Sequence, residues 1–149
     1  MNCPEVNESA IGRAHDQPFI WPVRVYYEDT DAGGVVYYAN YLRFIERART
    51  EWLRAIGFEQ TDLAAQYGIV FVVRSVAIDY LRPARFNDSL QVSVELIKVG
   101  AGHIDFVQRV IRGDELVASA VVKVACVGLQ KMRPIRIPRM LATRIRTGS

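Results

Sequence analysis

One long amphipathic helix, predicted over residues 40–56, constrains the fold of this chain more than any other feature. Its apolar residues recur at spacings of three and four, while charged residues occupy the rest of the circumference. Asn40 is expected as its N-cap, and Gly57 lies where a left-handed C-terminal cap is expected. A stripe this broad on a single long helix has to be buried by another part of the chain. The apolar positions are Tyr41, Leu42, Ile45, Ala48, Trp52 and Ile56.

The rest of the sequence predicts β-strands joined by short connections. Residues 20–28 alternate in the phase of Val23 and Val25, which predicts a first strand ahead of the helix. After a short helical turn at Asp62–Tyr67, further strands are predicted over residues 69–81, 90–96, 103–112 and 116–127. Short connections favour antiparallel pairing. Because five such strands can bury one broad helix only by curling around it, the sequence predicts an α+β fold with the sheet wrapped around one long central helix.

Chain length and charge indicate one domain with two tails. A chain of 149 residues that is 50% hydrophobic suits a single compact domain. We assign it to residues 20–130, with a flexible N-terminal tail at 1–19 and a basic C-terminal tail at 131–149. This last segment carries six basic residues and no acid. Such a run is most often a solvated terminus, and the alternatives are contact with anionic lipid, nucleic acid or substrate phosphates.

Cysteine usage and hydropathy indicate a soluble protein in a reducing compartment. Cys3 and Cys126 form neither a disulfide framework nor a zinc-ligand spacing, so we expect no metal site and a cytoplasmic location. The first 19 residues contain no signal-peptide pattern, and no later run approaches the roughly 18–20 apolar residues that span a bilayer.

The segment just before the helix carries the residues most able to take part in binding or catalysis. Asp31 and the pair Gly33-Gly34 place a carboxylate and a sharp turn ahead of a helix start, where backbone N–H groups are free. An acid and several amides can converge there on one small polar group. A plain turn before a helix would need the same residue types, so the pattern alone allows both a turn and a site.

At this point the sequence resembles a known family, the hotdog-fold thioesterases, and most closely the acyl-CoA thioesterases associated with the Tol-Pal system. The resemblance covers about residues 20–135 and continues in the blocks Glu46–Glu51, Phe71–Arg74, Arg82–Leu90 and Phe106–Arg109. It implies a hotdog fold, hydrolysis of acyl-CoA thioesters without a cofactor, and a homodimer or dimer of dimers (a homotetramer) with active sites between subunits. The stretch that carries it is Glu28-Asp29-Thr30-Asp31-Ala32-Gly33-Gly34-Val35-Val36-Tyr37.

The same resemblance assigns roles to individual residues. Asp31 matches the catalytic aspartate, which can attack the carbonyl as a nucleophile or act as general base on water, and both roles stay open. The backbone N–H of Tyr38, with its neighbours, is expected to stabilise the oxyanion. Tyr38 is also a departure, because the Tol-Pal-associated family has histidine there and the 4-hydroxybenzoyl-CoA thioesterases have tyrosine. The expected substrate-binding residues are Gly33, Gly34, Val35, Val36, Tyr37 and Arg74.

Other functions fit the sequence less well. Neither histidine, His15 or His103, lies near Asp31 in the sequence, which disfavours hotdog hydratases, and no Gly-x-Ser-x-Gly motif marks a serine hydrolase. The predicted substrates are acyl-CoA esters with short to medium or aromatic acyl groups. The alternative is a low-turnover hotdog binding protein that engages acyl carrier protein or the Tol-Pal envelope system; nucleic acid is not an expected partner. By residue type, the candidates for binding the CoA phosphates are Arg74, Arg82, Arg85, Lys98, Arg109 and Lys131.

Overall fold

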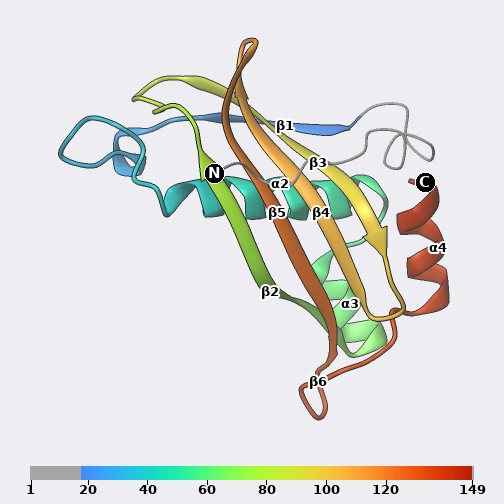
Figure 1. The fold of residues 1–149 in the computed structure, drawn as a ribbon. Coiled ribbons are helices and arrows are strands. Elements are labelled where there is room, and N and C mark those ends of the chain that lie inside the picture. The colour runs from blue at the N-terminus through green and yellow to red at the C-terminus, as the bar shows by residue number, and fades with distance from the viewer. Residues whose placement is uncertain (1–17, 149) are drawn as a thin grey trace.

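A computed structural model describes residues 18–148, in which one curled antiparallel sheet lies against helix α2 (Asn40–Ala55) (Figure 1). The strand order is β1-β3-β4-β5-β2, and the two-residue strand β6 (Arg133–Pro134) pairs with β5. The predicted α+β hotdog architecture of five strands around one helix is therefore confirmed. Nearly all of the expected N-terminal tail lies outside the described residues. The five long strands are β1 (Phe19–Arg24), β2 (Ile69–Tyr80), β3 (Ser89–Val99), β4 (His103–Arg112) and β5 (Glu115–Gly128).

The first strand is shorter than predicted. It ends at Arg24, and a 3₁₀ turn, η1 (Tyr27–Asp29), follows where the alternation predicted extended chain. The Asp29 carboxylate accepts the Tyr26 N–H at 2.8 Å, and the Asp29 N–H bonds the Tyr26 carbonyl at 3.0 Å. These local bonds compete with the β-ladder and close the turn.

Helix α2 agrees with its predicted range to within one residue, but its ends differ from each other. At the C-terminal end Gly57 has φ +102°, its N–H bonds the Arg54 carbonyl, and the Phe58 N–H bonds the Leu53 carbonyl. This pair of bonds is a Schellman motif, so the predicted glycine cap is confirmed. The predicted N-cap at Asn40 is wrong, because its side-chain amide instead donates to the Asp29 carbonyl at 2.9 Å.

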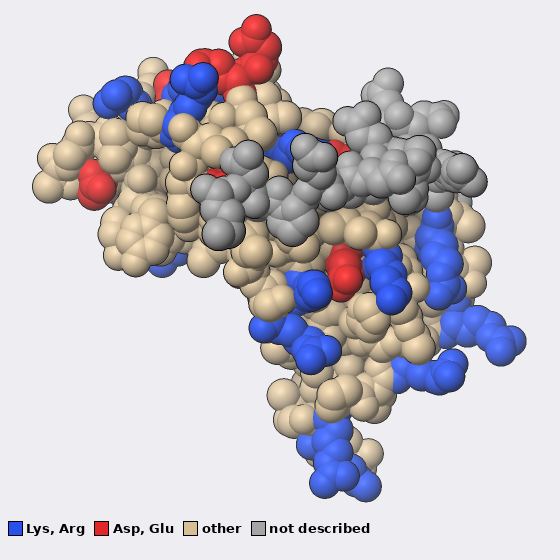
Figure 2. Space-filling view, viewed as in Figure 1, with Lys and Arg blue, Asp and Glu red and all other residues tan. Residues whose placement is uncertain are grey.

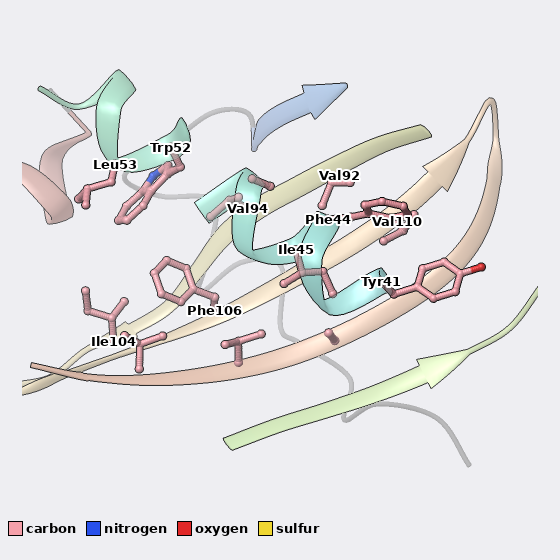
Figure 3. Packing of buried hydrophobic residues seen from close by; sticks show 14 of the residues in the cluster. Tyr41, Phe44, Ile45, Trp52, Leu53, Val92, Val94, Ile104, Phe106 and Val110 are labelled. Atoms are coloured by element: carbon pink, nitrogen blue, oxygen red, sulfur yellow. The ribbon is translucent and has the colours of Figure 1, made fainter. Parts of the chain in front are cut away.

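The core forms where α2 meets the concave face of the sheet (Figure 3). Trp52 packs edge-on against Phe106, with ring centroids 5.2 Å apart. Short helix α3 (Gln60–Tyr67) adds the buried Leu63. The apolar stripe predicted from the sequence is thus the face that the sheet covers. Labelled core residues are Tyr41, Phe44, Ile45, Trp52 and Leu53 of α2, and Val92, Val94, Ile104, Phe106 and Val110 of the sheet.

One polar side chain, Gln108, is fully buried within this core. Its amide nitrogen donates to the carbonyls of Ile45 at 3.0 Å and Ser93 at 3.3 Å. Its amide oxygen accepts a hydrogen bond from Arg49 Nη1 at 3.0 Å. Burial lowers the pKa of Arg49, and the nearby Glu46 charge opposes that shift. Gln108 therefore ties the helix to two strands through satisfied polar contacts.

The basic C-terminal segment contains helix α4 (Arg139–Thr147), which packs against the rest of the domain. Leu141 and Ile145 are fully buried, and the Arg144 guanidinium donates to the Ile56 carbonyl at 2.9 Å. The expectation of a solvated terminus is wrong for this helix, because its apolar residues share one face and its arginines are spread over the rest. Lys and Arg side chains gather over the end of the molecule that carries α4 and β6 (Figure 2).

Strand β2 is an edge strand of the sheet, and within residues 18–148 no strand pairs with its outer side. This edge is 12 residues long and carries exposed apolar side chains. They are Val72, Val73, Val76 and Tyr80. A long apolar edge of this kind is a template for pairing with another chain.

Candidate active site

The loop ahead of α2 is held in a two-stranded arrangement. The Asp31 N–H bonds the Val35 carbonyl at 2.9 Å, and the Tyr37 N–H bonds the Asp29 carbonyl at the same distance. The Val36 N–H bonds Ala84, so the loop is also attached to the segment that follows β2. These backbone bonds hold both ends of the loop, Asp29 to Asp31 and Val35 to Tyr37, in a hydrogen-bonded framework, which is what a preorganised site requires.

Asp31 lies at the turn end of this loop. Its Oδ1 accepts the Gly33 N–H at 2.8 Å, and a Cβ on Gly33 would lie 3.2 Å from that oxygen. Gly34 has the left-handed φ of +81° that favours glycine, whereas at Gly33 a Cβ would crowd the Asp31 carboxylate. The Asp31 side chain is exposed in the single chain.

Free amides are present just before α2, at Tyr38 and its neighbour Ala39, which is where the resemblance places the oxyanion donors. The N–H groups of Asn40, Tyr41 and Leu42 bond carbonyls three residues earlier, which satisfies the first helical turn. Within residues 18–148, the N–H groups of Tyr38 and Ala39 donate to no acceptor. The positive end of the helix dipole therefore presents two unused donors just before the helix begins.

Aromatic side chains cluster around the Tyr38 ring. Tyr38 contacts Tyr37, with centroids 4.8 Å apart, and meets the edge of Tyr80 at 6.1 Å. Tyr80 packs against Tyr41, whose hydroxyl accepts the Ala84 N–H at 3.2 Å. Burial raises the pKa of Tyr41 and of Tyr80, and the contact with Tyr38 raises the pKa of Tyr37. These phenols are therefore neutral at neutral pH and act as walls and hydrogen-bond groups rather than as bases.

Two of the predicted substrate-binding residues are placed differently from the rest. The Val36 side chain is 5% exposed and belongs to the core. Arg74 sits at a β-bulge in β2, between Val73 and Ser75, six residues before Tyr80. At the usual strand rise that is about 20 Å along the edge. One chain therefore does not bring Arg74 to the loop. Gly33, Gly34, Val35 and Tyr37 do lie on the loop with Asp31 and Tyr38.

Sequence reasoning missed Tyr80 and Tyr41 as neighbours of Tyr38. Tyr80 ends a strand some forty positions later, and only the sheet order brings it to this place. An aromatic residue at the end of a predicted strand was the one available signal.

The described part of the chain has neither a candidate metal site nor a helix that could span a membrane. No group of three or more His, Cys, Asp or Glu residues there could hold a metal ion. None of the helices between residues 18 and 148 is long and apolar enough to cross a membrane.

Known proteins resemble the chain in sequence and in structure. The model of the Thioesterase-like superfamily matches residues 25–145. Acyl-CoA thioesterase YbgC of Haemophilus influenzae is 51% identical over 124 residues, which are 83% of this chain and 91% of that protein. Acyl-CoA thioester hydrolase YbgC of Escherichia coli O6:H1 is 46% identical over 124 residues, covering 83% of this chain and 92% of the relative.

Solved structures agree with this likeness. A probable thioesterase from Bartonella henselae has a TM-score of 0.78 at 34% identity, covering 82% of this chain and 100% of its own. A hypothetical protein from Aquifex aeolicus has a TM-score of 0.80 at 30% identity, and the match covers 85% of this chain and 98% of that chain. The range matched by the family model includes the loop, α2 and the whole sheet from β2 to β5.

Proposed function

Because this chain belongs to the thioesterase-like superfamily, we propose that it is an acyl-CoA thioesterase whose chemistry takes place between Asp31 and the amides before α2. Relatives at 51% and 46% identity carry the names acyl-CoA thioesterase and acyl-CoA thioester hydrolase. The reaction adds water across the thioester and releases the free acid and the CoA thiol. The observation that carries the proposal is one hydrogen-bonded loop holding both an exposed carboxylate and two unused amide donors.

The amides supply electrostatic stabilisation. As the thioester carbonyl is attacked, its oxygen gains negative charge, and the N–H groups of Tyr38 and Ala39 are the donors available to it. Removing one such donor typically costs about 2.7–4 kcal/mol of transition-state stabilisation. Because these groups belong to the backbone, the role needs no particular side chain at position 38.

Asp31 supplies the second half of the chemistry, as nucleophile or as general base. The Gly33 N–H holds one carboxylate oxygen in place, which leaves the other to face the substrate. As a nucleophile Asp31 would form a mixed anhydride and expel the thiolate, and water would then hydrolyse the anhydride. As a base it would take a proton from the attacking water. Gly33, Gly34, Val35 and Tyr37 form the adjoining substrate surface.

A second copy of the chain would complete the site. An exposed carboxylate is screened by water, and the apolar edge of β2 next to Tyr80 needs a cover. A second copy related by a two-fold axis and paired through β2 would exclude water from Asp31 and cover the β2 edge. The assembly would be a homodimer or half of a dimer of dimers. Arg74 can contribute to substrate binding only in such an assembly, because in one chain it lies far along the edge from Tyr80.

Thiol release from a panel of short, medium and aromatic acyl-CoAs tests the function. Asp31→Asn should lower kcat by about 10²–10⁴-fold, in line with the loss of a positioned acid–base group. Asp114→Asn, in the exposed β4–β5 turn, is the matched control and should retain wild-type rates. Equal and negligible release by wild type and Asp31→Asn would favour the alternative, a binding protein that engages acyl carrier protein or the Tol-Pal system.

A single turnover in oxygen-18 water, followed by mass spectrometry of the product and the enzyme, tests the nucleophilic role of Asp31. Transfer of an unlabelled oxygen from Asp31 to the product acid, with label left in the enzyme, indicates a mixed anhydride that water opens at the Asp31 carbonyl. Product that takes its new oxygen from water alone fits both general-base attack and attack of water on the acyl carbon of the anhydride, and acylated Asp31 in acid-quenched enzyme then indicates the nucleophilic route.

A further inference from the structure

Arg85 lies across the loop from Asp31. Its backbone forms a β-bridge with Val35, and Val35 in turn accepts the Asp31 N–H. Two strand spacings, about 10 Å, therefore separate the Arg85 backbone from that of Asp31. A long side chain at this position can meet a group that extends outward from a thioester held at Asp31.

The segment that carries Arg85 is fixed in place. The Arg85 N–H bonds Asp88 Oδ2 at 2.9 Å, and the Asp88 N–H bonds the Arg85 carbonyl at 3.1 Å. Phe86 stacks on Tyr27 of η1, with ring centroids 3.9 Å apart and planes 12° from parallel. Arg85 is thus an exposed side chain on an ordered base, so little backbone entropy is lost when it binds a ligand.

The arginines around Arg85 are engaged in contacts within the domain. Arg82 pairs with Glu115 at 3.6 Å, and Arg24 donates to the Asn87 carbonyl at 2.9 Å. Arg112 pairs with Asp88 at 2.7 Å. Burial favours a higher pKa for Asp88, but the hydrogen bonds from the Arg85 N–H and from Arg112, with the positive charges of both arginines, hold that pKa below its ordinary value.

Arg85 itself has no such partner. Between residues 18 and 148, no carboxylate lies within 4.0 Å of its guanidinium and no side-chain hydrogen bond engages it. Its guanidinium feels the charge of Asp88 without contacting it, and its planar fork of donors is left to match phosphate oxygens.

The other basic residues considered from the sequence are less suited. Arg109 pairs with Glu95 at 2.8 Å. Lys98 lies nine positions along β3 from Ser89, about 30 Å from the loop end of that strand. Lys131 is next to β6, at the opposite end of the molecule (Figure 1).

We propose that Arg85 binds a phosphate group of the carrier to which the acyl group is attached, an inference that rests on the thioesterase function proposed above. CoA and phosphopantetheine share this chemistry. The carrier arm would run from the thioester at Asp31 past Val35 to the guanidinium. Arg85 is a binding residue in this scheme, and it takes no part in the bond-making step.

Substrate truncation tests the proposal. The same acyl group is offered as its CoA thioester and as its N-acetylcysteamine thioester, which carries no phosphate. Arg85→Ala should raise KM for the acyl-CoA about tenfold, as expected for one charge-assisted contact. The ratio of kcat/KM between the two thioesters should fall by the same factor. Arg85→Lys should recover part of that ratio. Arg82→Ala, the ion-paired neighbour, is the matched control and should keep the wild-type ratio.

The phosphopantetheine thioester identifies which phosphate is bound. If it shows the same dependence on Arg85 as acyl-CoA, the contact is to the phosphate next to the pantetheine arm. If only acyl-CoA depends on Arg85, the contact is to the nucleotide phosphates. An equal loss on all three thioesters, or no loss on any, would overturn the proposal.

A binding measurement separates this inference from the proposed function. Calorimetric titration of free CoA into wild type and Arg85→Ala should show about tenfold weaker binding by the variant. If neither wild type nor Asp31→Asn hydrolyses any thioester, the proposed function fails, and this titration still decides the role of Arg85. Equal CoA affinity of the two proteins would contradict it.

Discussion

The two ends of helix α2 are completed in opposite ways. At the C-terminal end Gly57 and Phe58 satisfy the last carbonyls, and Arg144 adds a hydrogen bond to Ile56 and lies 5.4 Å from the Phe58 ring centroid. At the N-terminal end no side chain caps the helix, and two amides before it have no acceptor within the described chain. The C-terminal end, which we give only a role in stability, has its backbone carbonyls satisfied by the chain itself. An end left open beside a carboxylate keeps its polar groups available for a ligand.

The packing of α4 at the C-terminal end of α2 should stabilise the fold, and Leu141→Ala should have the largest effect on the free energy of unfolding. Leu141 is fully buried in α4, so its truncation should lower the free energy of unfolding by about 2–5 kcal/mol, measured by denaturant titration. Met140→Ala, exposed on the same helix, should stay within about 0.5 kcal/mol of wild type. Activity per folded molecule should not change. A fall in kcat comparable to that of Asp31→Asn would show that the two ends are coupled.

A smaller loss is expected for Gly57→Ala. The left-handed φ of +102° and an added Cβ 2.6 Å from Arg144 Nη1 both oppose a side chain here. We expect a loss of about 1–2 kcal/mol, seen as a lower Tm. The same substitution in an Arg144→Ala background separates the two causes, because only the backbone strain then persists. An unchanged Tm in both backgrounds would contradict the role given to this cap.

The smallest effect is expected at the open end, for Tyr38→Phe. This variant removes the hydroxyl and keeps the N–H, so kcat should change by less than about threefold. Steady-state hydrolysis of one acyl-CoA, with Asp31→Asn measured alongside, gives the comparison. A loss of kcat as large as that of Asp31→Asn would show that the Tyr38 hydroxyl, rather than its backbone N–H, takes part in catalysis.

The sequence was most informative where structure follows from local pattern. The predicted range of β4 agrees with the structure residue for residue, and α2 agrees to within one residue, because both have clear periodicity. Prediction failed where a side chain competes with the backbone, as Asp29 does in η1 and Asn40 does at the start of α2. It also failed at α4, where charge outweighed the apolar spacing in our interpretation.

The site was predictable only in part. Asp31 and Tyr38 belong to one continuous motif, so their shared loop could be inferred from the sequence. The approach of Tyr80 to Tyr38 depends on sheet order, and the pairing of Arg85 with Val35 depends on how the segment after β2 folds back. Neither has a local signature.

Gln108 has a consequence for how this core can vary between homologous chains. A leucine or methionine of similar volume would fill the space, but it would remove the added hydrogen bonds to the Ile45 and Ser93 carbonyls and leave the Arg49 guanidinium without its Gln108 acceptor. Most neighbouring positions can exchange one apolar side chain for another at little penalty. Position 108 can change only together with position 49, so substitutions at these two places should be correlated rather than independent.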